Sequence, residues 1–138
     1  MAYWLYPANI KFYDVFGAFS KNTAYWPVRS RVAVGDTVLI YLAAPYKQVG
    51  FSTNVAQVDL KLTEVFDKVS PYFKQLPDKN ENEKPFMKLV NITAIKVGEE
   101  SPLSLVRLKE FGLKGMLMGP RKLDNSPALL TYVRGVLK

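Results

Sequence analysis

The chain contains neither cysteine nor histidine among its 138 residues. Without cysteine it can form no disulfide and no thiolate metal site. Without histidine it lacks the most common general base and the most common side-chain metal ligand. No apolar run is long enough to span a membrane, and no basic segment followed by an apolar stretch opens the chain as a signal peptide would. These absences predict a cytoplasmic domain that binds no membrane and holds no metal or cofactor.

The charge of the chain is strongly of one sign. Lysine and arginine number 19 against 12 acidic residues, which gives a net charge of +7. Basic side chains attract phosphates and release their counterions, so nucleic acid is a candidate partner. The alternative is that the charge only keeps the protein in solution. The length predicts one domain, residues 1–138, with one sizeable core.

A central hairpin organises the predicted fold. Thr37–Leu42 is a continuous apolar, β-branched run, which is typical of a strand covered on both faces. After a short loop with a proline, a second strand begins at residue 49 and alternates as far as residue 58. The aromatic and basic segment 25–31 leads into this hairpin. We expect Trp26, Arg29 and Tyr41 to converge at one mouth of the fold, where a ligand would bind.

Shorter elements surround the hairpin. Strands are predicted over residues 2–6, ended by Pro7, over 86–97 and over 121–123. Helices are predicted from Asn9 to residue 17, over 61–74 with a break at Pro71, from residue 101 to 112, and from residue 126 to 137. Residues 75–84 read as a mobile polar loop, and the acidic pair 99–100 suits a helix N-terminus. The fold class is therefore α+β: a small sheet of about five or six strands, curled into a barrel with short flanking helices.

No catalytic constellation is visible in the sequence. There is no glycine-rich phosphate loop and no cysteine or histidine nucleophile pair. Asp36 follows Gly35 in a turn, which predicts a structural role. We therefore expect a binding domain and not an enzyme.

Aromatic residues are the most informative part of the composition. They make up 13% of the chain, and several stand beside basic residues, as Trp26 does before Arg29 and Phe73 before Lys74. Aromatic rings stack on bases, while arginine and lysine hold phosphates. Trp4 is expected in the core and Trp26 at a site. Tyr72 and Phe73 suit either a site or core packing.

Several short motifs, taken in order, resemble the EVE and YTH group of the PUA-like superfamily. Tyr3-Trp4-Leu5 looks like the first strand of that group. Residues 26–30 (Trp-Pro-Val-Arg-Ser) are similar to its W-x-V-R-N segment, with Ser30 in place of asparagine, and the strand through Tyr41 follows. Towards the end, residues 102–109 and 121–123 match its L-x-x-L-K helix and R-L strand.

The resemblance implies a PUA-like barrel with a pocket for a flipped, modified base. In DNA, such domains serve as specificity domains of modification-dependent restriction systems; others read methylated bases in RNA. We predict that the base is held by Trp26, Asn9, Ser30, Tyr41, Tyr72 and Phe73. We predict that flanking phosphates are held by Lys11, Arg29, Arg31, Arg121 and Lys122.

The partner is thus expected to be DNA with a modified base, a methylated one such as methylcytosine or methyladenine, with RNA as the alternative. A fused or associated nuclease or NTPase would act as effector. Two other hypotheses stay open. One is a general RNA-binding module of PUA type that reads shape and phosphates. The other is a protein-interaction or ligand-sensing domain whose charge serves solubility.

Overall fold

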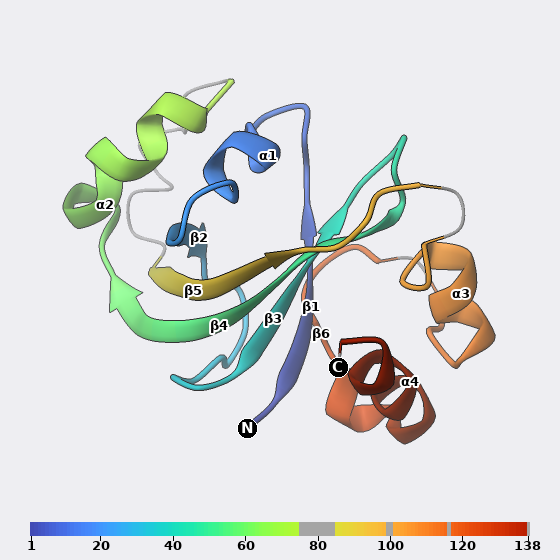
Figure 1. Ribbon diagram of the computed structural model, residues 1–138. Coiled ribbons are helices and arrows are strands. Elements are labelled where there is room, and N and C mark those ends of the chain that lie inside the picture. The colour runs from blue at the N-terminus through green and yellow to red at the C-terminus, as the bar shows by residue number, and fades with distance from the viewer. Residues whose placement is uncertain (75–84, 99–100, 116, 138) are drawn as a thin grey trace.

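The computed structural model describes residues 1–74, 85–98, 101–115 and 117–137. Six strands form one sheet in the order β2-β5-β4-β3-β1-β6 (Figure 1). Their bounds are β1 (Tyr3–Ala8), β2 (Ala24–Pro27), β3 (Thr37–Leu42), β4 (Gln48–Leu60), β5 (Phe86–Ala94) and β6 (Arg121–Lys122). Strands β1 and β3 are parallel, and the other neighbouring pairs are antiparallel. The sheet curls into a half-barrel, which confirms the predicted α+β fold class.

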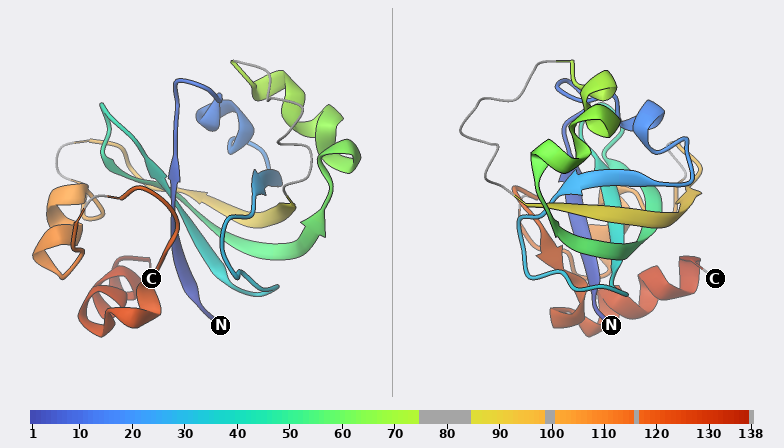
Figure 2. Two further views of the ribbon diagram at one scale, coloured as in Figure 1. Left: turned by 180° about the vertical axis from the view of Figure 1, so that it is seen from behind. Right: turned by 90° about the vertical axis from the view of Figure 1, so that its left-hand side faces the viewer.

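Helices cover both faces of the curled sheet. Helices α1 (Val15–Ala18) and α2 (Leu62–Val69) pack on the concave face, and α3 (Leu105–Glu110) and α4 (Pro127–Leu137) lie on the other (Figure 2). Two short 3₁₀ helices, Ser70–Tyr72 and Leu123–Asn125, continue α2 and precede α4. No helix in the described parts of the chain is both long and apolar enough to cross a lipid bilayer.

The hairpin of β3 and β4 lies at the centre of the sheet, as predicted. All six residues of β3 are buried, because the strand has a core on each side. Val38, Ile40 and Leu42 pack in the inner core, with α1 and α2. Leu39 and Tyr41 pack in the outer core, with α3 and α4. Successive side chains of a strand point to opposite faces, so one apolar run supplies both cores.

Two predictions for the N-terminal segment are wrong. Strand β1 does not end at Pro7 but continues to Ala8. Strand β6 pairs with Trp4 and Leu5. Pro7 lies beyond this short ladder, so its lack of an N–H removes no hydrogen bond to β6 and does not end the strand. The first helix also does not begin after Asn9, whose side chain accepts a bond from the Lys11 N–H at 2.9 Å within a turn. Helix α1 begins at Val15, with Asp14 as its N-cap.

Two further boundaries differ from the prediction. Residues 24–27 form strand β2, although the sequence predicts no strand in the aromatic and basic segment that leads into the hairpin. Only four residues long, this strand forms by pairing with β5, with Tyr25 opposite Lys88. Helix α3 begins at Leu105 rather than at residue 101, because the Ser104 hydroxyl accepts from the Arg107 N–H at 3.2 Å and caps it. The predicted loop 75–84 and the acidic pair 99–100 lie outside the described residues.

Asp36 has the structural role that its position in a turn predicts. Its carboxylate accepts bonds from the Ala2 N–H at 2.9 Å, the Ala33 N–H at 2.9 Å and the indole N–H of Trp4 at 3.0 Å. Burial alone would raise the pKa of Asp36, but these three donors outweigh it and hold the pKa below its ordinary value. Trp4 itself is buried in the inner core, so this carboxylate ties the start of β1 to the turn before β3.

Candidate nucleic-acid interface

Five aromatic residues gather at the edge of the inner core, and Tyr13 is at their centre. We call them the aromatic cluster: Tyr13, Phe19, Trp26, Tyr72 and Phe73. The Tyr13 ring contacts Trp26 edge-on with the ring centroids 5.2 Å apart, Phe73 edge-on at 5.0 Å and Tyr72 at 6.0 Å. Trp26 also contacts Phe19 at 5.7 Å. Edge-to-face contacts of this kind stabilise aromatic pairs beyond their burial, so the neighbouring rings hold the Tyr13 ring in position.

Backbone hydrogen bonds hold the two loops of the cluster together. The Asp14 N–H donates to the Tyr72 carbonyl at 2.6 Å, and the Lys74 N–H donates to the Phe12 carbonyl at 2.9 Å. The ammonium of Lys74 donates to the Ile10 carbonyl at 2.7 Å. The segment after β1 and the segment after α2 are therefore neighbours, although about sixty residues separate them in the sequence.

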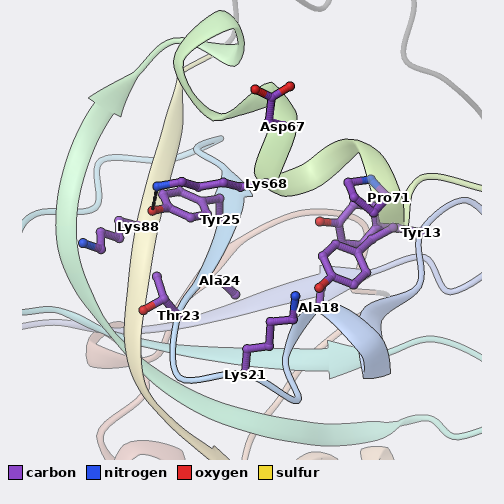
Figure 3. Close-up of a pocket in the computed structure, with 11 residues that line it drawn as sticks. Tyr13, Ala18, Lys21, Thr23, Ala24, Tyr25, Asp67, Lys68, Pro71 and Lys88 are labelled. Carbon is purple, nitrogen blue, oxygen red and sulfur yellow. Dashed lines mark hydrogen bonds between the residues drawn. The ribbon is translucent and has the colours of Figure 1, made fainter.

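A pocket of about 510 Å³ opens beside the aromatic cluster. This volume falls within the range of about 300–1,000 Å³ that is usual for small-molecule sites. Tyr13 and Tyr72, whose ring centroids are 6.0 Å apart, form one wall. Tyr25 from β2 stands across from Tyr13 (Figure 3). The lining residues are Tyr13, Ala18, Lys21, Thr23, Ala24, Tyr25, Asp67, Lys68, Pro71, Tyr72 and Lys88.

Lysines dominate the charge of the pocket. Lys21, Lys68 and Lys88 line it together with a single carboxylate, Asp67. The Lys68 ammonium lies 5.1 Å from the centroid of the Tyr25 ring and donates to the Tyr25 hydroxyl at 3.1 Å (Figure 3). Lys88 stands opposite Tyr25 in the β2–β5 ladder, so their side chains share a face. The pocket thus offers aromatic surface together with positive charge.

The hydroxyl of Tyr13 is protonated at neutral pH. Burial raises the pKa of Tyr13, and the neighbouring Tyr72 and Asp14 raise it further. Among the described residues, neither the Tyr13 nor the Tyr72 hydroxyl has a hydrogen-bond partner, and neither is sealed from solvent. Both can therefore donate to, or accept from, a polar group that enters the pocket.

Three of the six predicted base-binding residues come together at Tyr13. Trp26, Tyr72 and Phe73 all contact Tyr13, but of these only Tyr72 lines the pocket. Tyr41 is 6% exposed and lies in the outer core. The prediction that Tyr41 converges with Trp26 is wrong, because alternation along β3 directs the tyrosine to the opposite face of the sheet.

Asn9 and Ser30 do not line the pocket, and both side chains are engaged elsewhere. The side-chain oxygen of Asn9, Oδ1, accepts a hydrogen bond from the Lys11 N–H and so closes a turn. The Ser30 hydroxyl is hydrogen-bonded to the Tyr6 hydroxyl, which also accepts from the Arg29 N–H at 3.3 Å. The segment after β2 is thereby tied back to β1, which helps to close the curl of the sheet.

The predicted phosphate-binding residues fall in two separate places. Lys11, Arg29 and Arg31 are exposed on segments that follow β1 and β2. Arg121 and Lys122 form β6, at the other edge of the sheet from β2. The Lys122 ammonium lies 5.7 Å from the Trp4 ring, and the Arg121 guanidinium donates to the Lys114 carbonyl. None of the five lines the pocket, so they form no single rim around it.

The residues that do line the pocket were partly missed by the sequence analysis. Tyr13 falls within the helix predicted from Asn9 to residue 17, and Tyr25 falls within the aromatic and basic segment 25–31, but neither is predicted as a site residue. Lys21, Lys68 and Lys88 carry no motif, because each comes from a different element. The alternation of side chains along a strand is a signal for Tyr25. Tyr25 and Trp26 are successive residues, so they point to opposite faces of β2, and only one of them can face the pocket. Among the described residues, no group of three or more potential metal ligands is present.

Comparison with known proteins finds the same fold in other solved structures. No protein-family model matches the sequence, and no curated protein matches it. A variant of the ASCH protein from Zymomonas mobilis has a similar structure, with a TM-score of 0.66, 11% identity and coverage of 96% of each chain. A hypothetical protein from Leishmania major matches with a TM-score of 0.62 and 22% identity, over 98% of this chain and 93% of its own.

A third similar structure was solved with a nucleic acid. Human THYN1, in complex with DNA containing 5-methylcytosine, matches with a TM-score of 0.58 and 10% identity over 97% of each chain. These three proteins are similar to this chain across nearly its whole length, while their sequence identity is low. The three proteins therefore share the fold of this chain, a curled sheet with flanking helices.

Proposed function

We propose that this protein is a nucleic-acid-binding module that accepts a single base, extruded from its stack, in the pocket between Tyr25 and the Tyr13–Tyr72 wall. The observation that carries the proposal is the pocket itself: about 510 Å³, with three tyrosines and three lysines among its lining residues. A flipped base is held by stacking and by hydrogen bonds to its polar edge. Tyrosine rings supply the first, and the hydroxyls of Tyr13 and Tyr72 supply the second.

The surrounding cations suit the backbone of the same nucleic acid. Lys21, Lys68 and Lys88 line the pocket, and we assign them to the phosphates on either side of an inserted base. Arg29 and Arg31 are exposed on the segment after β2 and do not line the pocket, and we assign them to phosphates farther along the same strand. Trp26 and Phe73 support the Tyr13 ring from within the aromatic cluster, so we assign them to the wall of the site and not to direct contact.

We further propose that the base is modified, and specifically that it is a methylated base of DNA. The structural similarity to human THYN1, solved with DNA containing 5-methylcytosine, supports this choice. A methyl group against tyrosine rings gains about 0.8 kcal/mol from leaving water. That figure corresponds to a preference of about fourfold over the plain base. As a reader, the module would direct a fused or associated nuclease or NTPase to the marked base.

A binding panel tests this proposal. Short duplexes and single strands would carry cytosine, 5-methylcytosine, 5-hydroxymethylcytosine, adenine or N6-methyladenine at one central position. Affinities would be measured by fluorescence anisotropy at fixed salt, since affinity for nucleic acid depends steeply on salt. We expect one modified base to bind about fourfold or more tightly than its plain counterpart. Equal affinity for all of them would overturn the modified-base proposal, and no binding at low salt would overturn the function as a whole.

One observation favours a second candidate, a general RNA-binding module. Basic residues that do not line the pocket lie near both edges of the sheet, with Arg29 and Arg31 after β2 and Lys122 on β6. Such a spread suits phosphates of a structured RNA that is read by shape. This candidate predicts steep salt dependence with no response to base modification, and the same panel, extended to a folded RNA, distinguishes the two.

A further inference from the structure

The two open tyrosine rings of the pocket are each covered by a lysine of the same pocket. The Lys68 side chain runs along the Tyr25 ring, with its ammonium at the hydroxyl end, 3.1 Å from the hydroxyl oxygen and 5.1 Å from the ring centroid (Figure 3). The Lys21 ammonium lies over the Tyr72 ring at 5.4 Å from its centroid. The four residues come from different segments: Tyr25 from β2, Lys68 from α2, Lys21 from the segment after α1, and Tyr72 from the 3₁₀ helix. All four line the pocket.

A base cannot stack on a ring face along which a lysine side chain lies. Both lysine side chains are exposed, and the lysine stem is flexible, with a compact, strongly hydrated charge at its end. Each ammonium can therefore leave its ring without disturbing the core. Because the backbone of each lysine lies in the wall of the pocket, an ammonium that has left its ring stays within reach of a ligand bound there.

We propose that Lys21 and Lys68 exchange partners when a base enters: each leaves the tyrosine ring that it covers and binds a phosphate flanking that base. This inference rests on the proposed function, and it adds an assignment for two residues that act differently in the free and the bound protein. The ligand it requires is a nucleotide with its backbone phosphates, because a free base would displace the lysines and offer them no new partner.

The energetics of the exchange favour binding. An exposed ammonium over an aromatic ring contributes about two- to fivefold to an equilibrium constant. Stacking of a base on the same ring contributes about five- to 150-fold. The base therefore displaces the ammonium. The freed ammonium then neutralises a phosphate, and that gain is large at low salt and fades at high salt.

The two roles of each lysine make a distinctive prediction about salt. At low salt, removal of Lys68 loses a phosphate contact and weakens binding. At high salt, the phosphate contact contributes little, and the variant no longer has to uncover the Tyr25 ring. It should then bind up to about two- to fivefold more tightly than the wild type. The plots of log affinity against log salt for the two proteins should cross.

The experiment compares Lys68→Ala, Lys21→Ala and the wild type, with Lys109→Ala as the matched control. Lys109 is an exposed lysine on α3, on the other side of the sheet from the pocket. Affinity for the best oligonucleotide of the panel would be measured from about 50 mM to about 400 mM salt, the range over which the phosphate term changes most. Ring-current shifts of the lysine ε-methylene protons, read by NMR, would report whether each ammonium still covers its ring.

The expected result is a slope shallower by about 0.7 to 0.9 for each pocket variant, a crossing of the curves, and a control that follows the wild type. The lysine ε-methylene signals should lose their ring-current shift on binding. Wild-type binding with pocket-variant curves that never cross would overturn the exchange and leave the proposed function in place. Wild-type protein that binds no oligonucleotide would overturn both.

Discussion

Replacing Tyr25 with leucine should weaken nucleic-acid binding while leaving the fold intact. Tyr25 is half-buried in β2, and its ring lines the pocket opposite Tyr13. Stacking of one base on one ring is worth about 1–3 kcal/mol, so loss of the ring should reduce affinity about five- to 150-fold. Leucine retains most of the apolar contact with the inner core, so the free energy of unfolding should fall by less than about 1.5 kcal/mol.

The assay is fluorescence anisotropy with a labelled oligonucleotide, paired with a urea unfolding curve for each protein. Tyr25→Phe keeps the ring and should bind like the wild type, although it loses the 3.1 Å bond from Lys68. Tyr46→Leu removes an exposed tyrosine that packs on Phe16 and does not line the pocket, and it should also leave binding unchanged. Wild-type affinity in Tyr25→Leu would refute the stacking assignment.

Three further predictions concern the fold. Asp36→Asn should lower the free energy of unfolding by about 2–5 kcal/mol, because an amide cannot accept all three of the bonds that the carboxylate accepts. The pKa of Asp36 is below its ordinary 3.8, so wild-type stability should fall as the pH drops below about 4, and urea titrations should show the variant lacking this component. Gly50→Ala would place a methyl carbon 2.5 Å from Cδ1 of the buried Leu42, which should cost about 1–3 kcal/mol in the same assay. Burial raises the pKa of Tyr6 and Tyr13 above 10.0. Their phenolates therefore form more readily in the unfolded chain, and stability should be full below about pH 10 and decline above it; melting temperatures that stay constant to pH 11 would contradict this.

The fold class could be predicted from the sequence because the central hairpin has a clear local pattern of apolar and β-branched residues. The run Thr37–Leu42 is apolar on both faces, and the structure gives it a core on each side. Strand β2 could not be predicted in the same way. Its four residues take their extended form from pairing with β5, and a contact between residues sixty positions apart leaves no periodic signal in so short a segment.

The site was predictable only in its chemistry. Aromatic residues beside cations pointed to Trp26, Tyr72 and Phe73, and the structure gathers all three around Tyr13. Which of them would line a pocket depends on strand register and on how the loop after β1 meets the segment after α2. Both depend on contacts between distant parts of the chain, which local sequence patterns do not specify. Tyr41 shows the limit most clearly, because one position along β3 decides which core receives its ring.

The central claim is that a base occupies the pocket bordered by Tyr13, Tyr25 and Tyr72. An NMR titration with the best oligonucleotide of the panel tests it most directly, with the tyrosine ring resonances and backbone amides assigned. We expect the largest shifts at these three rings and at the Lys88 amide, with little change on α3 and α4. Shifts confined to β6 and the outer core, with the three tyrosines unmoved, would contradict it.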